Sequence, residues 1–228
     1  MSPRLSLCTL LALAGTTCLA SAATVTVHES LFNTMDATDG WSTDRMSTTP
    51  LGDRHFLGEF GNESAFLTIE EMPQHSVVNV SVELFVIRSW DGDEWPGPDV
   101  WEVLVDGEVF YSTTFANGDE TKPGTQSFAG SNTEARGPAA GRTGANENNT
   151  LGYFFREQPR DSVYNLTFEI PHTGSEMVLG FRASGLQPIN DESWGLGSVI
   201  VQAVTVPAPG ALALLAGVPV VQRRRRRA

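Results

Sequence analysis

The 228-residue sequence predicts an all-β protein, an antiparallel two-sheet sandwich of the jelly-roll type with a helical signal segment at each end. In several segments hydrophobic and polar residues alternate with a period of two, and no segment shows the 3.6-residue period of an amphipathic helix. The sequence also contains 22 glycines and 13 prolines, which indicates many turns. Because the alternation leaves one face of each strand polar, it favours antiparallel sheets over buried parallel ones.

At the amino terminus, residues 1–22 are typical of a secretory signal peptide. Arg4 supplies the positive charge, residues 5–14 supply a short apolar segment, and Ala20 and Ala22 form a small-residue cleavage site. The apolar segment is shorter than the ~20 residues that a membrane-spanning helix needs. Both cysteines of the chain lie in this segment, so we expect a mature protein without disulfide bonds.

Residues 23–206 are expected to form the sandwich domain, with roughly nine or ten strands and a closed barrel as the alternative. Within residues 78–86, Val80, Val82, Leu84 and Val86 point to one side and predict a central core strand. The other alternating segments are residues 65–69, 102–114, 164–170, 177–181 and 199–206. The dipeptide Asp106-Gly107 inside the segment 102–114 predicts a hairpin with a type I′ turn.

One long segment does not fit this pattern of strands. Residues 116–152 are rich in glycine, asparagine and threonine and contain few apolar side chains. A connection of this length is usually functional or disordered. We expect a solvated insertion, with a lid that faces a ligand as the alternative.

The charge distribution excludes a protein that binds nucleic acid by neutralising phosphates. The formal net charge is −12, and six of the 15 basic side chains, Arg4 and Arg223–Arg227, lie in terminal segments without acidic residues. Residues 23–206 therefore carry the other nine basic side chains together with all 27 acidic ones, a net charge of −18. Nucleic-acid binding requires the opposite balance.

A loop between two expected strands concentrates acidic side chains. The predicted metal ligands are Asp91, Asp93, Glu94 and Asp99. Calcium takes six to eight oxygen ligands, and carboxylates spaced two residues apart in a glycine-containing loop can converge on one ion. The loop therefore predicts a calcium site, although it lacks the full EF-hand spacing. The alternative is a solvated acidic loop whose tryptophans pack on the edge of the sheet.

Three tryptophans in or near acidic segments are the predicted ligand-binding residues: Trp90, Trp95 and Trp194. An exposed indole ring offers a flat apolar face on which a sugar ring can stack. An extracellular polysaccharide is therefore the expected ligand if these rings are exposed. If they are buried, a purely structural role in a matrix or in adhesion is favoured.

Nothing in the sequence predicts a catalytic site. It contains neither a Gly-x-Ser-x-Gly nucleophile motif nor a His-Glu-x-x-His metal motif, and its four histidines are scattered. A glycoside hydrolase needs two carboxylates across a groove. Glu102 and Asp106 share a strand face, but Asp106 belongs to the expected hairpin turn. We therefore expect a protein that is not an enzyme, with glycoside hydrolysis as the least favoured alternative.

The carboxyl-terminal residues 207–228 form a three-part segment. Pro207 and Pro209 precede a short apolar stretch, and five consecutive arginines follow, beginning with Arg223, Arg224 and Arg225. This layout resembles the PEP-CTERM sorting signals of Gram-negative envelope proteins, although Ala208 stands where the family usually has glutamate. The resemblance implies export, transient insertion in the inner membrane and cleavage by an exosortase-type enzyme. The expected destination is the cell envelope, the cell surface or the extracellular matrix.

Four short motifs of the body also carry a resemblance. They are Phe56-Leu57-Gly58-Glu59-Phe60-Gly61, Ser89-Trp90-Asp91-Gly92, Gly97-Pro98-Asp99 and Asp191-Glu192-Ser193-Trp194-Gly195. In these motifs the chain resembles a group of exported bacterial domains of unassigned function, often paired with PEP-CTERM tails. The resemblance implies an exported domain and no particular activity.

Overall fold

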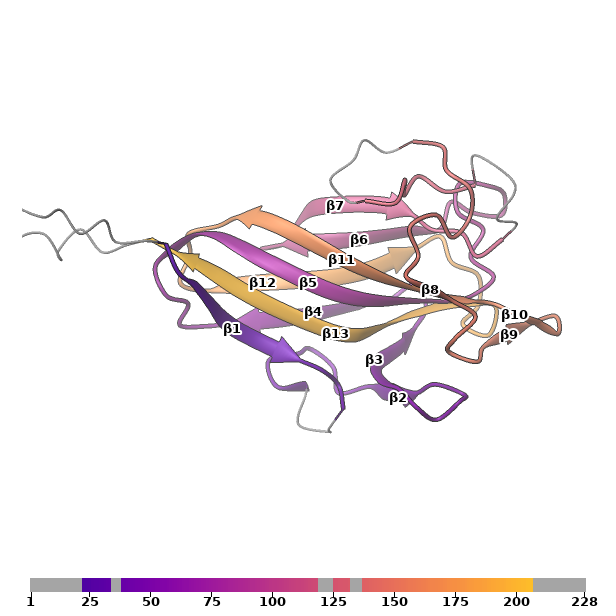
Figure 1. Cartoon of the computed structure of the whole chain (residues 1–228), viewed down its shortest axis with the longest axis horizontal. Helices are drawn as coiled ribbons and strands as arrows, with labels where there is room; N and C mark the ends of the chain where they lie inside the picture. The colour runs from indigo at the N-terminus through magenta and orange to yellow at the C-terminus, as the bar shows by residue number, and fades with distance from the viewer. Residues whose placement is uncertain (1–21, 34–37, 119–124, 132–136, 207–228) are drawn as a thin grey trace, which may run out of the picture. The chain divides into compact units, whose positions relative to one another are not determined.

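Two antiparallel β-sheets pack face to face in the computed structural model (Figure 1). The structure describes residues 22–33, 38–118, 125–131 and 137–206. Residues 23–206 form one unit by their contacts. The expected sorting segment and all but the last residue of the expected signal peptide lie outside the described residues, as do the helices predicted for them. Among the described residues, no helix has the length and apolar character needed to cross a bilayer.

The larger sheet has seven strands, of which β5, β11 and β13 form the centre. Strand β5 pairs with β11 on one side and with β13 on the other, while β1 and β3 share the far edge of β13. The strands of this sheet are β1 (Thr24–Ser30), β2 (Met46–Thr48), β3 (His55–Phe60), β5 (His75–Arg88), β8 (Glu147–Asn148), β11 (Asp161–Pro171) and β13 (Glu192–Thr205).

The smaller sheet has four strands in the order β4-β12-β6-β7. Its strands are β4 (Ser64–Ile69), β6 (Val100–Val105), β7 (Glu108–Thr114) and β12 (Met177–Ser184). A separate two-stranded hairpin consists of β9 (Phe154–Phe155) and β10 (Gln158–Pro159). The predicted antiparallel sandwich is therefore confirmed, with more short strands than the alternation indicates.

The core lies between the two sheets and contains side chains from both. Leu67 of β4, Phe181 of β12 and Val82 of β5 are among its buried residues. A second, smaller apolar cluster covers the outer side of the larger sheet, where Phe85 of β5 packs with Leu151. The period-two pattern holds where one face of a strand is solvated, because only then do buried and polar side chains alternate.

Two local predictions are confirmed. Strand β5 is central, and its residues Val80, Val82, Leu84 and Val86 are all buried in the main core. Strands β6 and β7 form the predicted hairpin, and both turn residues of Asp106-Gly107 have positive φ angles, 51° and 89°. Positive φ at both central residues is what a type I′ turn requires.

The described part of residues 116–152 differs from the solvated insertion expected there. Phe128 is buried in the main core, and the fully buried Gln126 side chain binds the backbone of its surroundings. Its Oε1 accepts hydrogen bonds from the backbone N–H groups of Ala116 and Arg142, and its Nε2 donates to the carbonyl of Phe128. A buried amide that replaces strand pairing in this way holds an irregular segment against a sheet.

The histidines are less scattered than their positions in the sequence indicate. His75 and His172 are 97 residues apart, yet His75 Nε2 lies 2.8 Å from His172 Nδ1 and the two rings stack. The antiparallel pairing of β5 with β11 brings the start of one strand next to the end of the other. This contact depends on pairing between distant segments, so the spacing of histidines in the sequence does not reveal it.

Candidate functional site: a groove beside a buried acidic triad

An open groove of about 640 Å³ lies at one end of the sandwich. Three segments form it: the loop after β5, the loop before β13, and the hairpin β9–β10. Its lining residues are Ser89, Asp91, Trp95, Pro96, Phe155, Arg156, Gln158, Arg160, Gln187 and Asp191. The hairpin lies at the opposite end of the domain from the start of β1 and the end of β13 (Figure 1). We refer to this site below as the groove.

The loop after β5 folds back on itself and is held from two sides. Trp90 is fully buried, and its Nε1 donates a hydrogen bond to the carbonyl of Ser193. The backbone N–H of Asp99 donates to the carbonyl of Gly92, which closes the loop. Gly92 has a φ of 69°, and a Cβ there would lie 1.8 Å from the carbonyl oxygen of Thr125. Only glycine fits this position, so the close approach depends on it.

The fold of this loop brings two of its carboxylates to a third from the start of β13. Asp91, Asp99 and Glu192 each offer an oxygen within 4.8 Å of the other two. Asp99 is 1% exposed and Glu192 is 0% exposed, while Asp91 is partly exposed and also lines the groove. We call these three residues the acidic triad.

Neighbouring groups satisfy most oxygens of the triad but not all of them. Gln187 Nε2 donates hydrogen bonds to Asp91 Oδ2 at 3.0 Å and to Glu192 Oε1 at 2.9 Å. The backbone N–H of Gln187 donates to Glu192 Oε2, and that of Asp91 donates to Asp99 Oδ2. Asp99 Oδ1 is buried and has no hydrogen-bond partner among the described residues. Such an oxygen is costly to bury unless a partner binds it.

Burial and mutual repulsion perturb all three carboxyl groups. Burial is the main cause that raises the pKa of Asp99 to about 7 and that of Glu192 to about 8, and repulsion from Asp91 contributes to both shifts. Burial also raises the pKa of Asp91. The three groups therefore resist carrying three negative charges together at neutral pH unless a cation lies among them. Their chemistry suits a hard divalent cation that prefers oxygen ligands.

The structure divides the predicted metal ligands into two pairs. Asp91 and Asp99 belong to the acidic triad, whereas Asp93 and Glu94 lie outside it. Asp93 is exposed, and its Oδ1 accepts a hydrogen bond from the hydroxyl of Thr114 instead. Glu192 is not among the predicted ligands, because its motif Asp191-Glu192-Ser193-Trp194-Gly195 is nearly a hundred residues away from the acidic loop in the chain.

The three predicted ligand-binding tryptophans also divide. Trp95 is 91% exposed and lines the groove. Trp90 and Trp194 are 0% exposed, so neither has a face to offer a ligand, and their assignment as ligand-binding residues is corrected to the core. Trp194 packs against Phe60 and donates from Nε1 to the carbonyl of Gly61. Both indoles satisfy their polar group inside the protein, which is why they can be buried.

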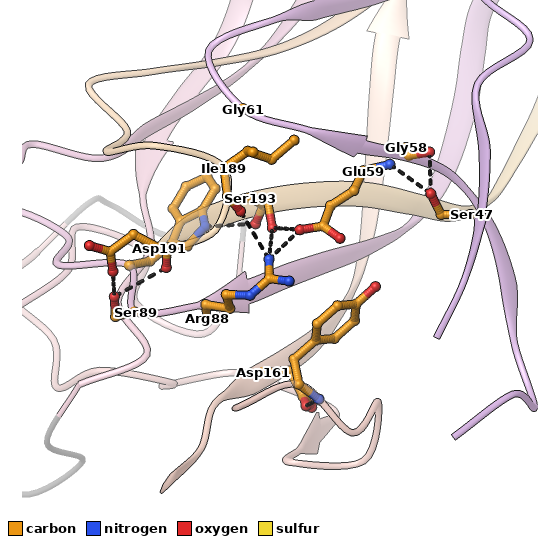
Figure 2. A network of polar contacts seen from close by, with 12 residues as sticks. Ser47, Gly58, Glu59, Gly61, Arg88, Ser89, Asp161, Ile189, Asp191 and Ser193 are labelled. Atoms are coloured by element: carbon orange, nitrogen blue, oxygen red, sulfur yellow. Dashed lines mark hydrogen bonds and ion pairs between the residues drawn. The ribbon is translucent and has the colours of Figure 1, made fainter. Parts of the chain in front are cut away.

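A polar network holds the start of β13, and with it Glu192, in place (Figure 2). Arg88 at the end of β5 binds the carboxylate of Glu59 and donates to the hydroxyl of Ser193. The hydroxyl of Ser193 donates in turn to Glu59 Oε1. On the groove side, the hydroxyl of Ser89 donates to the carboxylate of Asp191. These contacts join residues of three of the four short sequence motifs described above.

Aromatic and charged side chains of the hairpin complete the groove. Phe155 and Arg156 line it, and the guanidinium of Arg156 lies 4.9 Å from the centre of the Phe155 ring. Arg160 lines it as well, and its Nη1 donates to the carbonyl of Asn117 at 2.9 Å. The groove thus combines the exposed ring of Trp95 and the half-buried ring of Phe155 with several polar groups, the composition expected of a site that binds a polar ligand with apolar faces.

Comparison with known proteins gives structural likeness only. No family model matches the chain, and no curated protein sequence matches it significantly. Dimeric latent PorU from Porphyromonas gingivalis matches 83% of the chain with 9% identity and a TM-score of 0.46, but the chain spans only 13% of PorU. The xylan-binding module CBM15 matches 81% of this chain and 99% of its own length, with 12% identity and a TM-score of 0.36. The mannan-recognising carbohydrate-binding module TmCBM27 matches 81% of this chain and 100% of its own length, with 12% identity and a TM-score of 0.37.

Proposed function

We propose that residues 23–206 form an exported, non-catalytic module that binds a glycan in the groove. The observation that carries the proposal is the position of Trp95, whose ring is 91% exposed at the edge of the groove. An exposed indole at the edge of a groove offers a flat apolar face on which a sugar ring can stack. The same groove is shared by Phe155 and by side chains that can form hydrogen bonds, such as Gln158 and Gln187.

The aromatic and hydrogen-bonding side chains of the groove are complementary to the surface of a sugar. A pyranose ring has an apolar face of C–H groups that packs on an aromatic ring, and a rim of hydroxyl groups that donate and accept hydrogen bonds. An open groove also suits a segment within a long polymer, because the chain can enter at one side and leave at the other. We therefore propose an extracellular polysaccharide as the partner.

The carboxylates of the groove support binding rather than cleavage. Hydrolysis of a glycosidic bond needs one carboxyl group as acid and a second as base or nucleophile, ~5 to ~9 Å apart across the sugar. Asp91 and Asp191 line the groove, but Asp91 belongs to the acidic triad and Asp191 accepts a hydrogen bond from Ser89. Both carboxylates are therefore engaged by neighbouring protein groups.

Calcium at the acidic triad is part of the proposal. Asp91, Asp99 and Glu192 supply carboxylate oxygens, and the buried Asp99 Oδ1 lacks another partner among the described residues. A calcium ion there would offset the repulsion among the three groups and tie the loop after β5 to the start of β13. Since Asp91 also lines the groove, the ion would order the wall against which a ligand binds.

Export and display at the cell surface complete the proposal. The signal-peptide pattern of residues 1–22 and the sorting-signal pattern of residues 207–228 support it. They imply the export machinery and an exosortase-type enzyme as processing partners. The end of β13, which leads to the sorting segment, lies at the opposite end of the domain from the β9–β10 hairpin (Figure 1). A domain attached through that end would leave the groove open to a polymer outside the cell.

The first prediction tests the glycan-binding role with Trp95→Ala. We expect the secreted protein to bind one or more glycans on an array, and the variant to bind them about tenfold more weakly because the stacking contact is lost. Phe110→Ala is the matched control, because Phe110 is also an exposed aromatic residue, 41% exposed, on β7 outside the groove. Absence of any bound glycan, or equal binding by Trp95→Ala and wild type, would contradict the proposal.

A further inference from the structure

The groove differs in charge from the rest of this acidic domain. Seven arginines lie within the described residues, and four of them form ion pairs with glutamates. These pairs are Arg45–Glu63, Arg54–Glu147, Arg88–Glu59 and Arg182–Glu102. Arg156 and Arg160 both line the groove, and neither has a carboxylate of the described residues within ion-pair distance. In residues 23–206, with nine basic and 27 acidic side chains, two such arginines in one groove require an explanation.

Both guanidinium groups are held in place while keeping donors free for a ligand. Arg160 uses Nη1 to bind the carbonyl of Asn117, and its backbone N–H binds the carbonyl of Tyr153. Arg156 lies over the ring of Phe155 in the turn between β9 and β10. An arginine has five N–H donors in a planar arrangement, so one or two contacts leave most of them available. Restricting the side chain beforehand also lowers the entropy that binding costs.

The negative groups near these arginines are already engaged. Asp191 accepts hydrogen bonds from Ser89, and Asp91 lies in the acidic triad, where the proposed calcium ion would offset its charge. Glu157 stands between the two arginines in the turn and is exposed, but it does not line the groove. With calcium in the triad, the charges at the groove sum to zero, because two arginines and the ion balance Asp191 and the three triad carboxylates, whereas the domain as a whole is strongly negative.

We propose that the ligand of the groove is an acidic glycan, a polysaccharide that carries carboxylate groups, and that Arg156 and Arg160 bind its carboxylates. This inference rests on the glycan-binding function proposed above. A guanidinium group binds a carboxylate through two parallel N–H···O bonds, so the pair gives both affinity and orientation. A neutral glycan in the same groove would desolvate two cations without supplying a counter-charge, which is unfavourable.

The net charge of the whole domain restricts where an acidic polymer can bind. A net charge of −18 over residues 23–206 repels an acidic polymer from most of the surface. Binding is then favoured where guanidinium groups without ion-pair partners among the described residues offset the repulsion, and that place is the groove. The stacking contact with Trp95 and the carboxylate contact with the arginines thus act on the same sugar chain.

The test compares acidic glycans with neutral forms of the same polymers. A panel of uronate polysaccharides, such as polygalacturonate and hyaluronan, is measured beside their methyl esters and beside neutral glucans and xylans, at a fixed excess of calcium. We expect uronate polymers to bind at least tenfold more tightly than their esters. We also expect their binding to weaken as salt concentration rises, since screening reduces the attraction.

Two variants assign the selectivity to the groove. Arg156→Gln removes one guanidinium from an exposed turn and should weaken uronate binding about tenfold, while binding of the methyl esters stays within twofold of wild type. Arg45→Gln is the control, because it removes the same charge from an exposed ion pair outside the groove. A thermal melt of each variant excludes loss of folding as the cause.

The outcomes separate this inference from the proposed function. If neutral glycans bind through Trp95 as well as uronates do, the glycan-binding role stands and the acidic ligand is wrong. If dextran sulfate binds and no uronate does, the groove recognises anions but not carboxylated glycans, and the inference is again wrong. If no glycan binds at all, both the proposed glycan-binding function and the acidic ligand are wrong.

Discussion

At the scale of single residues, the acidic triad is costly to bury. Asp99 and Glu192 are fully buried, and a buried carboxylate without a charged partner is strongly destabilising. Gly92 and Gln187 belong to the same arrangement, since the first allows the loop to close and the second donates to two of the carboxylates. Such a cluster is retained when a cation or a proton compensates for it, so the state of these three groups should control local stability.

The calcium prediction is made with Asp99→Asn. Millimolar calcium should raise the melting temperature of the wild type by about 5 °C or more, because an ion that binds only the folded state stabilises it by mass action. Asp99→Asn keeps the shape of the side chain but removes one charge from the triad, so most of the increase should vanish. Magnesium should do less, because it dehydrates reluctantly and demands octahedral geometry.

The pH dependence of the calcium effect gives a second test of the metal site. The pKa values of Asp99 and Glu192 are raised to about 7 and about 8, so at pH 5.5 protons occupy the groups that calcium needs. The gain from calcium should therefore be smaller at pH 5.5 than at pH 8. Asp93→Asn is the matched control, because Asp93 lies in the same loop but outside the triad. A melt of the wild type that calcium and EDTA leave unchanged would refute the metal site.

The residues of the site show what sequence reasoning could reach. The acidic loop is a local feature, so Asp91 and Asp99 could be predicted from it as members of an acidic cluster. The third carboxylate could not, because Glu192 reaches the loop through the pairing of β13 with β5, where it lies opposite Arg88. Burial of a tryptophan is also a property of the assembled fold. Trp90 and Trp95 are five residues apart in one loop, yet one is fully buried and the other is 91% exposed.

At the scale of strands, the alternation of polar and apolar residues predicts the long strands that have one solvated face. It misses segments that are buried on both faces, such as the first half of β13. Strands β5 and β11 each have stretches with one face in the core and one face toward solvent, so their polar residues alternate with apolar ones. The first six residues of β13, Glu192–Gly197, are all buried, because the sheet continues on both sides of them and the rings of Phe56 and Phe85 lie against Gly195 and Gly197. Their alternation is lost, and only the second half of β13 could be predicted.

The prediction for this scale concerns the central strand. Val82→Asp places a charge between Leu166 of β11 and Val199 of β13, its partners on either side. An unpaired charge in the core costs several kcal/mol, a large part of the stability of a typical domain. We expect the variant to melt at least about 10 °C below wild type or not to fold.

Ser81→Asp is the control for the central strand. Ser81 is the preceding residue of β5 and is exposed on the outer face, so the same new side chain meets solvent. Its effect on the free energy of unfolding should remain near 0.5 kcal/mol, the usual range for surface substitutions. Equal melting temperatures for Val82→Asp and Ser81→Asp would show that the register of β5 is wrong.

At the scale of the whole molecule, the arrangement of the domain agrees with a protein displayed by one end. The first and last long strands, β1 and β13, pair with each other, and Thr24 lies opposite Val204. The amino-terminal and carboxyl-terminal boundaries of residues 23–206 therefore lie side by side, away from the hairpin that forms part of the groove (Figure 1). Removal of the segments beyond those boundaries would leave the strand pairing of the sandwich intact.

The last prediction is that processing removes both terminal segments in the native envelope. A signal peptidase should cut after Ala22, as the small residues Ala20 and Ala22 indicate. The arginines Arg223–Arg227 should hold the carboxyl end on the cytoplasmic side while the sorting segment is in the membrane, until an exosortase-type enzyme cuts near Pro207–Pro209. Intact-mass analysis of the protein isolated from its native envelope should then give a mass without residues 1–22 and without the arginines. Replacing the five arginines with glutamine should leave an uncut or mislocalised form, since the retention signal is gone. A wild-type species that keeps Arg223–Arg227 would show that the segment is a plain membrane anchor instead.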